Sequence, residues 1–134
     1  MKIDQVLLDT LSAQAKASPR LRMNLDLRNS PEDHSQRMLN ALEPGTVMPI
    51  HRHRNSSETV VVLRGKVKWL YYNDQGALID SFVVAPGTDL LGLSVPKGQW
   101  HSLECFESGT VILETKDGLW EPLGEDNVMM LKNE

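Results

Sequence analysis

The stretch from Gly45 to Gly65 reads GTVMPIHRHRNSSETVVVLRG and carries the pattern that decides the fold. Two histidines, His51 and His53, stand two residues apart, and the carboxylate of Glu58 follows five residues after the second. Because alternate residues of a strand point to the same face, both imidazoles can face one side of a sheet. Charged groups inside a small barrel are costly unless they are paired, for example with a cation. The stretch therefore predicts a metal site in a β-rich domain.

A third histidine, His101, ends the segment PKGQWH at residues 96–101, so three of the four histidines belong to one pattern. Three imidazoles and one carboxylate form a ligand set for a divalent first-row transition metal, with open positions left for water or a substrate oxygen. We expect residues 96–98 to form a tight turn with Pro96 at the second position and Gly98 at the fourth. That turn would present His101 from the opposite sheet as the fourth ligand.

Length and composition describe one globular domain. Of the 134 residues, 40% are hydrophobic and 24% are charged, which is ordinary for a domain with its own core. The net charge of -4 and the pI near 5.5 argue against nucleic acid or an anionic membrane as a partner. Acidic residues interrupt the apolar N-terminal run, and no run has membrane-spanning length, so a cytoplasmic protein is expected.

Residues 1–19 are expected to form an N-terminal helical segment, and residues 20–134 the barrel of the same domain. Helical spacing predicts one apolar face made of Ile3, Val6, Leu7, Leu11 and Ala15. Asp4 can cap the start of this helix, and the dipeptide before Arg20, Ser18-Pro19, can end it because the residue before a proline avoids the helical region.

Short β-rich segments separated by glycine and proline turns follow the helix. Residues 20–27 alternate between apolar and polar side chains, which is typical of a half-buried strand. Further strands are expected over residues 36–43, 59–63, 67–72, 78–84, 100–106 and 110–115. Such spacing predicts a sandwich or a small barrel. Residues 126–134 are expected either to pack as a short closing segment or to fray.

Both histidine segments resemble the two motifs of the cupin superfamily. Residues 45–65 match the first motif in residue type and spacing, namely a glycine, H-x-H, a glutamate and a closing glycine. Residues 96–101 match P-x-G-x-x-H, the centre of the second motif, although its leading glycine is displaced to Gly92 and its terminal asparagine is Cys105. The resemblance covers about residues 36–116. It implies an all-β fold, the cupin double-stranded β-helix or small jelly-roll barrel, preceded here by a short α-helix.

Three segments also resemble a narrower group, the WbuC-type cupins, which are small bacterial single-domain proteins. They are RLRMNLDL at 20–27, QRMLNALEPGTVMPIHRH at 36–53 and GQWHSLECFESGTVILETKDG at 98–118. Some WbuC-type cupins are associated with surface-polysaccharide gene clusters. The resemblance therefore implies a metal-binding cupin that handles a sugar or a sugar nucleotide.

Polar residues on the strands before the metal motif are candidates for substrate contacts. Alternation puts Arg22, Asn24 and Asp26 on one strand face, which either lines a pocket or faces solvent. Arg22 can hold a carboxylate or a phosphate by a bidentate contact, and Arg37 is an independent candidate. The predicted substrate-binding residues are therefore Arg22, Asn24, Arg37 and Asn40.

Two other reactive side chains admit two interpretations each. His34, in the loop PEDHSQ, is either a solvated loop residue or a catalytic acid or base at the mouth of the site. Cys105 shares a strand face with His101 and is interpreted as a small buried thiol, or alternatively as an oxidisable thiol beside the metal. The larger aromatic residues are expected in the core or an interface, with stacking on a sugar ring as the alternative.

Two classes of function fit this pattern. In an enzyme, one divalent ion of iron, manganese, nickel or zinc would polarise a carbonyl or hydroxyl during sugar isomerisation or epimerisation, with His34 or a pocket carboxylate moving the proton. An Fe(II) dioxygenase is the competing enzyme class. In a non-catalytic module, the ion would fix a small ligand or brace the barrel. The expected partners are a small molecule such as a carbohydrate and a second copy of the chain, since an edge strand or the helix needs cover.

Overall fold

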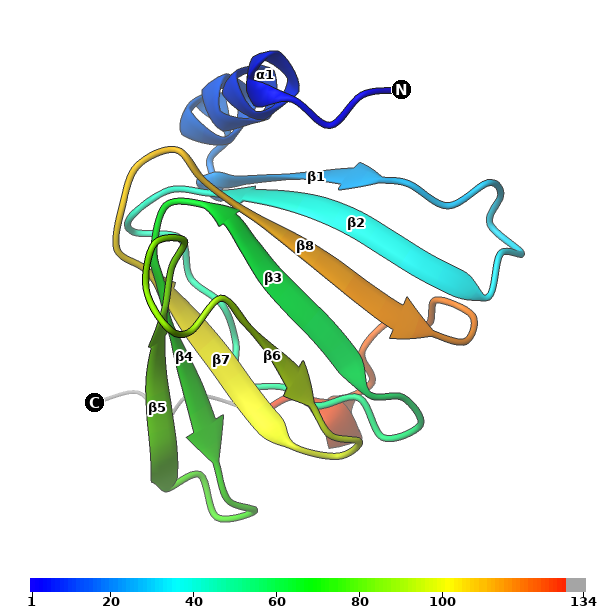
Figure 1. Ribbon diagram of the computed structural model, residues 1–134. Coiled ribbons are helices and arrows are strands. Elements are labelled where there is room, and N and C mark those ends of the chain that lie inside the picture. Colours follow the sequence, from blue (N-terminus) through cyan, green and yellow to red (C-terminus); the bar gives the residue numbers. More distant parts are fainter. Residues whose placement is uncertain (130–134) are drawn as a thin grey trace.

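The computed structural model describes residues 1–129 of the chain (Figure 1). The elements in this part are α1 (Gln5–Ala17), β1 (Arg22–Asp26), β2 (Ser35–Leu42), β3 (Glu58–Arg64), β4 (Val67–Tyr72), β5 (Leu78–Val84), β6 (Gly92–Val95), β7 (Trp100–Cys105), β8 (Thr110–Asp117) and the 3-10 helix η1 (Glu125–Asn127). The sequence predicted helix α1 and seven of these strands; β6 and η1 are additional.

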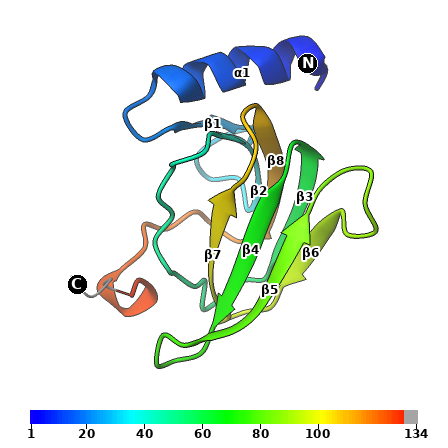
Figure 2. The ribbon, with the colours of Figure 1, turned by 90° about the vertical axis from the view of Figure 1, so that its left-hand side faces the viewer.

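The strands form two antiparallel sheets that face each other. The larger sheet has the strand order β1-β2-β8-β3-β6, and the smaller one has the order β5-β4-β7. Helix α1 lies across the outer face of the larger sheet, beside β1 (Figure 2). This is the predicted all-β architecture with one short N-terminal helix.

The start and end of α1 agree with the predicted caps. The Asp4 carboxylate accepts a hydrogen bond from the Leu7 amide at 3.0 Å, and Ser18 leaves the helical conformation directly before the proline. The predicted apolar face was partly wrong, because Val6 is 73% exposed and Ile3 is also exposed. Val6 stands two residues from the buried Leu8, which is about 200° around a helix, so the two side chains point in nearly opposite directions.

The outer face of the larger sheet is covered by the helix. The cluster between them contains Leu8, Leu11, Ala15, Leu39, Ala41 and Val111. Arg64 fixes the helix from the end of β3: its Nη1 donates to Asp9 Oδ1 at 2.7 Å and its Nη2 donates to Ser12 Oγ at 3.1 Å. The helix therefore completes the core of the barrel domain.

The main core lies between the two sheets. Its buried members are Leu42, Val60, Val62, Val67, Trp69, Val84, Val95, Leu103, Cys105 and Ile112. Cys105 donates a hydrogen bond to the Glu107 carbonyl at 3.2 Å, and burial raises the pKa of its thiol. The interpretation of Cys105 as a buried core thiol is confirmed.

Strand β6 was missed because GLSV is short and begins with glycine. Gly92 allows β6 to pair with β3, since a Cβ at this position would collide with the Val60 carbonyl oxygen. The expected register of the turn between β6 and β7, at residues 96–99, was also wrong. Gln99 N donates to Pro96 O at 3.2 Å, and Gly98 has a φ of +76°. Proline is therefore the first residue of the turn and glycine the third, the position where a type II turn needs positive φ.

Candidate metal centre

The three histidines of the two motifs converge at one end of the space between the sheets. One nitrogen of each of His51, His53 and His101 lies within 4.8 Å of the others. His101 comes from β7 of the smaller sheet, and the other two come from the loop between β2 and β3. The structure thus brings together the residues that the sequence pattern singled out, from segments about fifty residues apart.

The expectation that His51 and His53 lie on a regular strand was wrong. His51 forms isolated bridges instead, and in the one with His101 its amide donates to His101 O at 3.0 Å and its carbonyl accepts from His101 N at 2.9 Å. Gly98 N likewise donates to the His53 carbonyl at 2.8 Å. Backbone hydrogen bonds to β7 and its preceding turn therefore position the H-x-H segment.

Two of the imidazoles have their tautomers set by backbone carbonyls. The Nδ1 atoms of His51 and His101 each lie 2.8 Å from a carbonyl oxygen, of Pro49 and Gln99 respectively. A carbonyl only accepts, so Nδ1 carries the proton and Nε2 is left with a free lone pair. His101 Nε2 is buried and has no hydrogen-bond partner among residues 1–129. An orphaned basic nitrogen facing two other imidazoles is the donor pattern of a metal ligand.

Glu58 supplies a carboxylate to the same place. It is the first residue of β3 and only 6% exposed. Its Oε1 lies 3.4 Å from His101 Nε2, and its Oε2 lies 3.8 Å from His53 Nε2. Three imidazoles and one buried carboxylate fit a divalent transition metal in number and in ligand type.

The electrostatic setting keeps two of the imidazoles ready to bind a cation. Burial lowers the pKa of His51 to about 4. Burial followed by the charge of Lys116 lowers the pKa of His53 to about 4. Both rings are therefore neutral at pH 7, and a metal ion would not have to displace protons from them.

A cavity of about 390 Å³ opens onto this cluster. Its wall includes all four predicted ligands and the side chains of Arg22, Asn24 and Asn40. These three residues occupy one face of β1 and β2, where Arg22 pairs with Leu42 and Asn24 pairs with Asn40. The face whose role the sequence left open thus lines a pocket.

Arg37 lies elsewhere. Its side chain donates to the carbonyls of Leu27 at 2.9 Å and Ser35 at 2.8 Å, and it lies 3.5 Å from the Asp33 carboxylate. It borders an adjoining cavity of about 260 Å³ that also reaches Asn24. Arg37 therefore shares a cavity with Asn24 but not with Arg22 or Asn40, and its guanidinium already donates to acceptors of the protein.

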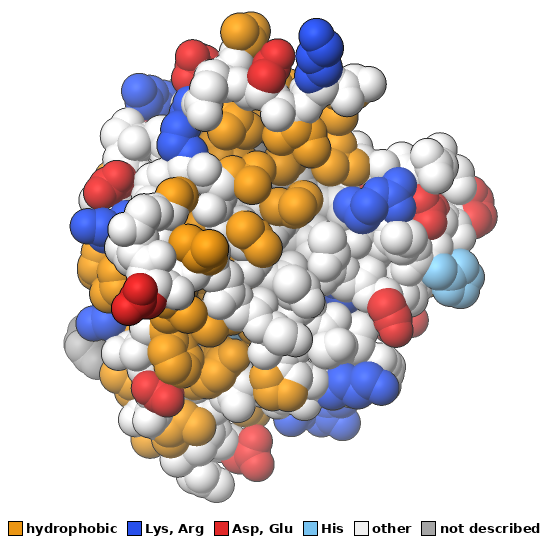
Figure 3. Space-filling model, in the orientation of Figure 1, with side chains coloured by type: hydrophobic (Ala, Val, Ile, Leu, Met, Phe, Trp, Pro, Cys, Tyr) orange, Lys and Arg blue, Asp and Glu red, His pale blue; other side chains and the backbone are white. Residues whose placement is uncertain are grey.

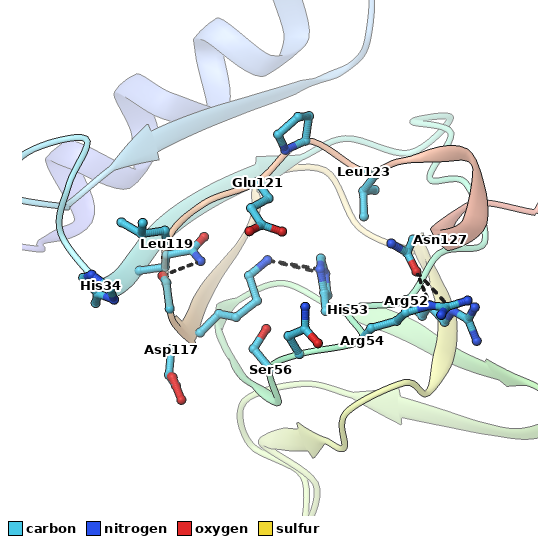
Figure 4. Close-up of a pocket in the computed structure, with 15 residues that line it drawn as sticks. His34, Arg52, His53, Arg54, Ser56, Asp117, Leu119, Glu121, Leu123 and Asn127 are labelled. Carbon is cyan, nitrogen blue, oxygen red and sulfur yellow. Dashed lines mark hydrogen bonds between the residues drawn. The ribbon is translucent and has the colours of Figure 1, made fainter.

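His34 borders a third pocket, of about 380 Å³, drawn in Figure 4. In this view His34 lies at one end of the pocket, His53 near the middle, and Arg54 and Asn127 at the opposite end. His34 is exposed and does not line the cavity that contains the four predicted ligands.

Sequence reasoning missed two charged residues of β8 that face the cavity. Glu114 pairs with Val60 and Lys116 pairs with Glu58, so both share the inward face of the sheet with Ile112. Strict alternation in TVILETKD, counted from a buried Ile112, was the signal that could have found them. Burial, aided by the nearby charge of Glu58, raises the pKa of Glu114 to about 8. Lys116 Nζ lies 3.4 Å from both ring nitrogens of His53.

The described part of the C-terminal segment packs against the loop that carries the ligands. Asn127 Oδ1 accepts from Arg52 Nε at 3.2 Å and from Arg54 Nε at 3.1 Å. Val128 forms an isolated bridge with His51. The expectation of a packed closing segment is met through residue 129, and residues 130–134 lie outside the described residues.

The sequence matches the model of a family described as "Domain of unknown function (DUF6016)" over residues 3–84, more than half of the chain. The protein belongs to this family. No curated protein matches the sequence significantly.

Several solved structures share the fold. KdgF from Halomonas sp. matches with a TM-score of 0.59 at 13% identity, over 75% of this chain and 82% of KdgF. CapF, a capsular polysaccharide assembling protein from Staphylococcus aureus, matches with a TM-score of 0.68 at 20% identity, over 87% of this chain and 33% of CapF. Oxalate oxidase, in complex with the substrate analogue glycolate, matches with a TM-score of 0.60 at 16% identity, over 77% of this chain and 54% of that enzyme.

These structures are cupins, and the likeness establishes the cupin fold for this chain. The chain spans about a third of CapF and about half of oxalate oxidase. Within this fold, His51, His53 and His101 have the ligand atoms and the spacing to hold a metal ion. Within the described residues, no helix is long and apolar enough to cross a membrane.

Proposed function

We propose that the protein is a metal-dependent cupin enzyme that acts on a sugar or a sugar nucleotide. His51, His53, Glu58 and His101 would hold one divalent ion of iron, manganese, nickel or zinc. The observation that carries this proposal is the buried Nε2 of His101, which faces two imidazoles and a carboxylate and lacks a hydrogen-bond partner in the described chain. When bound, the ion supplies a Lewis acid for a carbonyl or hydroxyl oxygen.

The chain's own residues would orient the substrate and move a proton. Arg22, Asn24 and Asn40 line the cavity of the four ligands and are proposed as substrate contacts, and Arg37 is proposed as a contact from the adjoining cavity. For isomerisation or epimerisation, a side chain must accept a proton from carbon and return it. Glu114, in the same cavity, and His34, in the neighbouring pocket, are the candidates for that role.

Two likenesses support a sugar-type substrate. CapF is a capsular polysaccharide assembling protein with the same fold. Three segments of the sequence resemble WbuC-type cupins, some of which are associated with surface-polysaccharide gene clusters. We infer a cytoplasmic role in surface-polysaccharide metabolism from these likenesses.

A second copy of the chain is the proposed protein partner. Hydrophobic side chains gather on one face of the molecule, from below α1 to the region of β5 (Figure 3). Strand β5 is the edge of its sheet and exposes Leu78, Ile79 and Val83. An apolar edge strand of this kind is stabilised when a second strand or molecule covers it. A sedimentation experiment that finds only monomer at high concentration would remove this part of the proposal.

A competing reaction class is favoured by the likeness to oxalate oxidase, which was solved with the acid glycolate. Iron or manganese in the site would direct assays toward oxygen-dependent chemistry on a small acid. Zinc or nickel would direct them toward sugar isomerisation.

The proposal is tested by elemental analysis of the untagged protein by mass spectrometry. We expect a near-stoichiometric divalent metal in the native chain and its loss in His101→Ala. The matched control is His34→Ala, which removes the fourth histidine of the chain and should retain the metal. If the native protein carries no metal even after reconstitution, or if His101→Ala keeps it fully, the metalloenzyme proposal is wrong.

A further inference from the structure

Two buried polar atoms on the wall formed by β1 and β2 lack partners among the residues the structure describes. They are Nε of Arg22 and Oδ1 of Asn40. Asn40 is only 4% exposed, and both residues line the cavity that contains the histidine cluster. Buried polar groups in native proteins are nearly always hydrogen-bonded, because an unpaired one is costly. These two atoms are therefore placed to be satisfied by a ligand.

The two atoms are close enough in register to contact one molecule. Arg22 pairs with Leu42 and Asn24 pairs with Asn40, so Arg22 and Asn40 are diagonal neighbours on the inward face of the paired strands. Diagonal neighbours of an antiparallel pair are within reach of long side chains. A small ligand that entered this cavity would meet both residues.

The chemistry of the two atoms specifies complementary ligand groups. Arg22 Nε is a charged donor and needs an acceptor, preferably an anion. Its Nη1 is already directed at Met48 Sδ at 3.3 Å and Val47 O at 3.5 Å. Asn40 Oδ1 is an acceptor and needs a donor, which a ligand hydroxyl supplies. One molecule that carries both an anionic oxygen and a hydroxyl is a hydroxy acid.

The charges around the cavity favour an anionic ligand. Burial lowers the pKa of Arg22, so its charge is desolvated and gains from one counter-ion. Arg20 and Lys116 line the same cavity as Arg22 and the Glu58 carboxyl, so cations outnumber this carboxylate there and favour an anionic group on the ligand.

We propose that Arg22 and Asn40 form a subsite for a small hydroxy acid, in which Arg22 Nε donates to the carboxylate and Asn40 Oδ1 accepts from a hydroxyl. The inference rests on the proposed function, because it assigns that site its substrate class: a sugar acid rather than a neutral sugar. Asn24, beside Asn40 on β1, borders the same subsite.

The test is isothermal titration calorimetry on the chelator-treated, metal-free protein, so that a carboxylate cannot bind through the metal. The probes are gluconate, glucitol, propionate and inorganic phosphate. Gluconate is expected to bind, whereas glucitol, which has hydroxyls without a charge, and phosphate are expected not to bind at the same concentrations. Arg22→Gln should weaken gluconate at least about tenfold. Asn40→Leu, nearly isosteric, should weaken gluconate about fivefold and leave propionate unchanged.

Lys68→Gln is the charge-matched control, since Lys68 neighbours the inward-facing Trp69 on β4 and points away from the cavity. Thermal melts verify that each variant folds. If Arg22→Gln does not fold, the subsite is tested by Asn40→Leu alone, through the comparison of gluconate binding with propionate binding. Equal binding of glucitol and gluconate, tighter binding of phosphate, or unchanged gluconate binding in Arg22→Gln would overturn the inference. The metal analysis is independent, so a metal-containing protein that ignores gluconate refutes this inference alone.

Discussion

The two faces of strand β2 differ in how completely their side chains are satisfied. Leu39 and Ala41 point outward to helix α1, are fully buried, and lie in an apolar cluster. Met38 and Asn40 point inward and line the cavity of the histidine cluster, where Asn40 Oδ1 has no partner in the described chain. Neighbouring residues of one strand thus serve opposite purposes. The outward face stabilises the domain, and the inward face keeps polar atoms free for a ligand at the expense of stability.

The largest expected effect comes from breaking the outward face. Leu39→Ala removes a fully buried side chain beneath α1 and should lower the free energy of unfolding by about 2–5 kcal/mol. Chemical denaturation monitored by circular dichroism measures this change. The metal content per folded molecule should stay at the wild-type value, because Leu39 does not line the cavity. A loss of metal in the folded variant would show that the two faces are coupled.

The buried titratable groups around the cavity should make the free energy of unfolding of the metal-free protein depend on pH. His51 and His53, each with a pKa lowered by burial to about 4 from 6.5, lose protons on folding, so stability should rise from pH 4 to pH 6.5. Glu114, with a pKa raised by burial to about 8 from 4.5, keeps a proton that the unfolded chain releases. Its contribution therefore falls as pH rises toward 8, by at most about 1.4 kcal/mol per pH unit.

The two histidines of the unfolded chain finish losing their protons about one pH unit above 6.5, so the fall expected between about pH 7.5 and pH 8 belongs to Glu114. The measurement is a series of urea denaturation curves in buffer with chelator, on the native chain and on Glu114→Gln. The variant should keep the rise below pH 6.5 and lose the fall above it. An equal fall in both proteins would mean that Glu114 is ionised in the fold.

The smallest expected effect concerns the cap of the covering helix. Asp4→Ala removes the acceptor for the Leu7 amide and should lower the free energy of unfolding by about 1 kcal/mol. A modest drop in the melting temperature measures it, and Asp4→Asn, which retains a side-chain acceptor, is the matched control. If the alanine and asparagine variants melt together, the cap contributes nothing and the helix is held by its packing alone.

Much of the fold followed from local pattern. Alternation placed β1, and β-rich segments between turn residues placed β4 and β5, within a residue or two of their observed bounds; Asp4 and Pro19 marked the ends of α1. Strand β6 escaped prediction because it has four residues and its pairing with β3 depends on the close approach at Gly92. The outward direction of Val6 escaped because a loose apolar spacing fits more than one helix face.

The candidate site likewise has one part that the sequence predicted and another that it did not. The spacing of His51, His53 and Glu58 with the later His101 singled out the candidate ligands, because few other arrangements require those residue types at those intervals. Spacing gave no sign of Glu114 or of its raised pKa, since its burial and its proximity to Glu58 arise only when β8 pairs with β3.

By itself, the sequence determined the element types and the candidate metal ligands, because alternation, turn residues and motif spacing are local properties of the chain. Only the tertiary structure decided which polar residues share the cavity. It placed Arg22, Asn40 and Glu114 beside the histidines and left Arg37 and His34 in neighbouring pockets. The physical reason is that strand order and register, set by contacts between distant segments, choose the neighbours of each side chain.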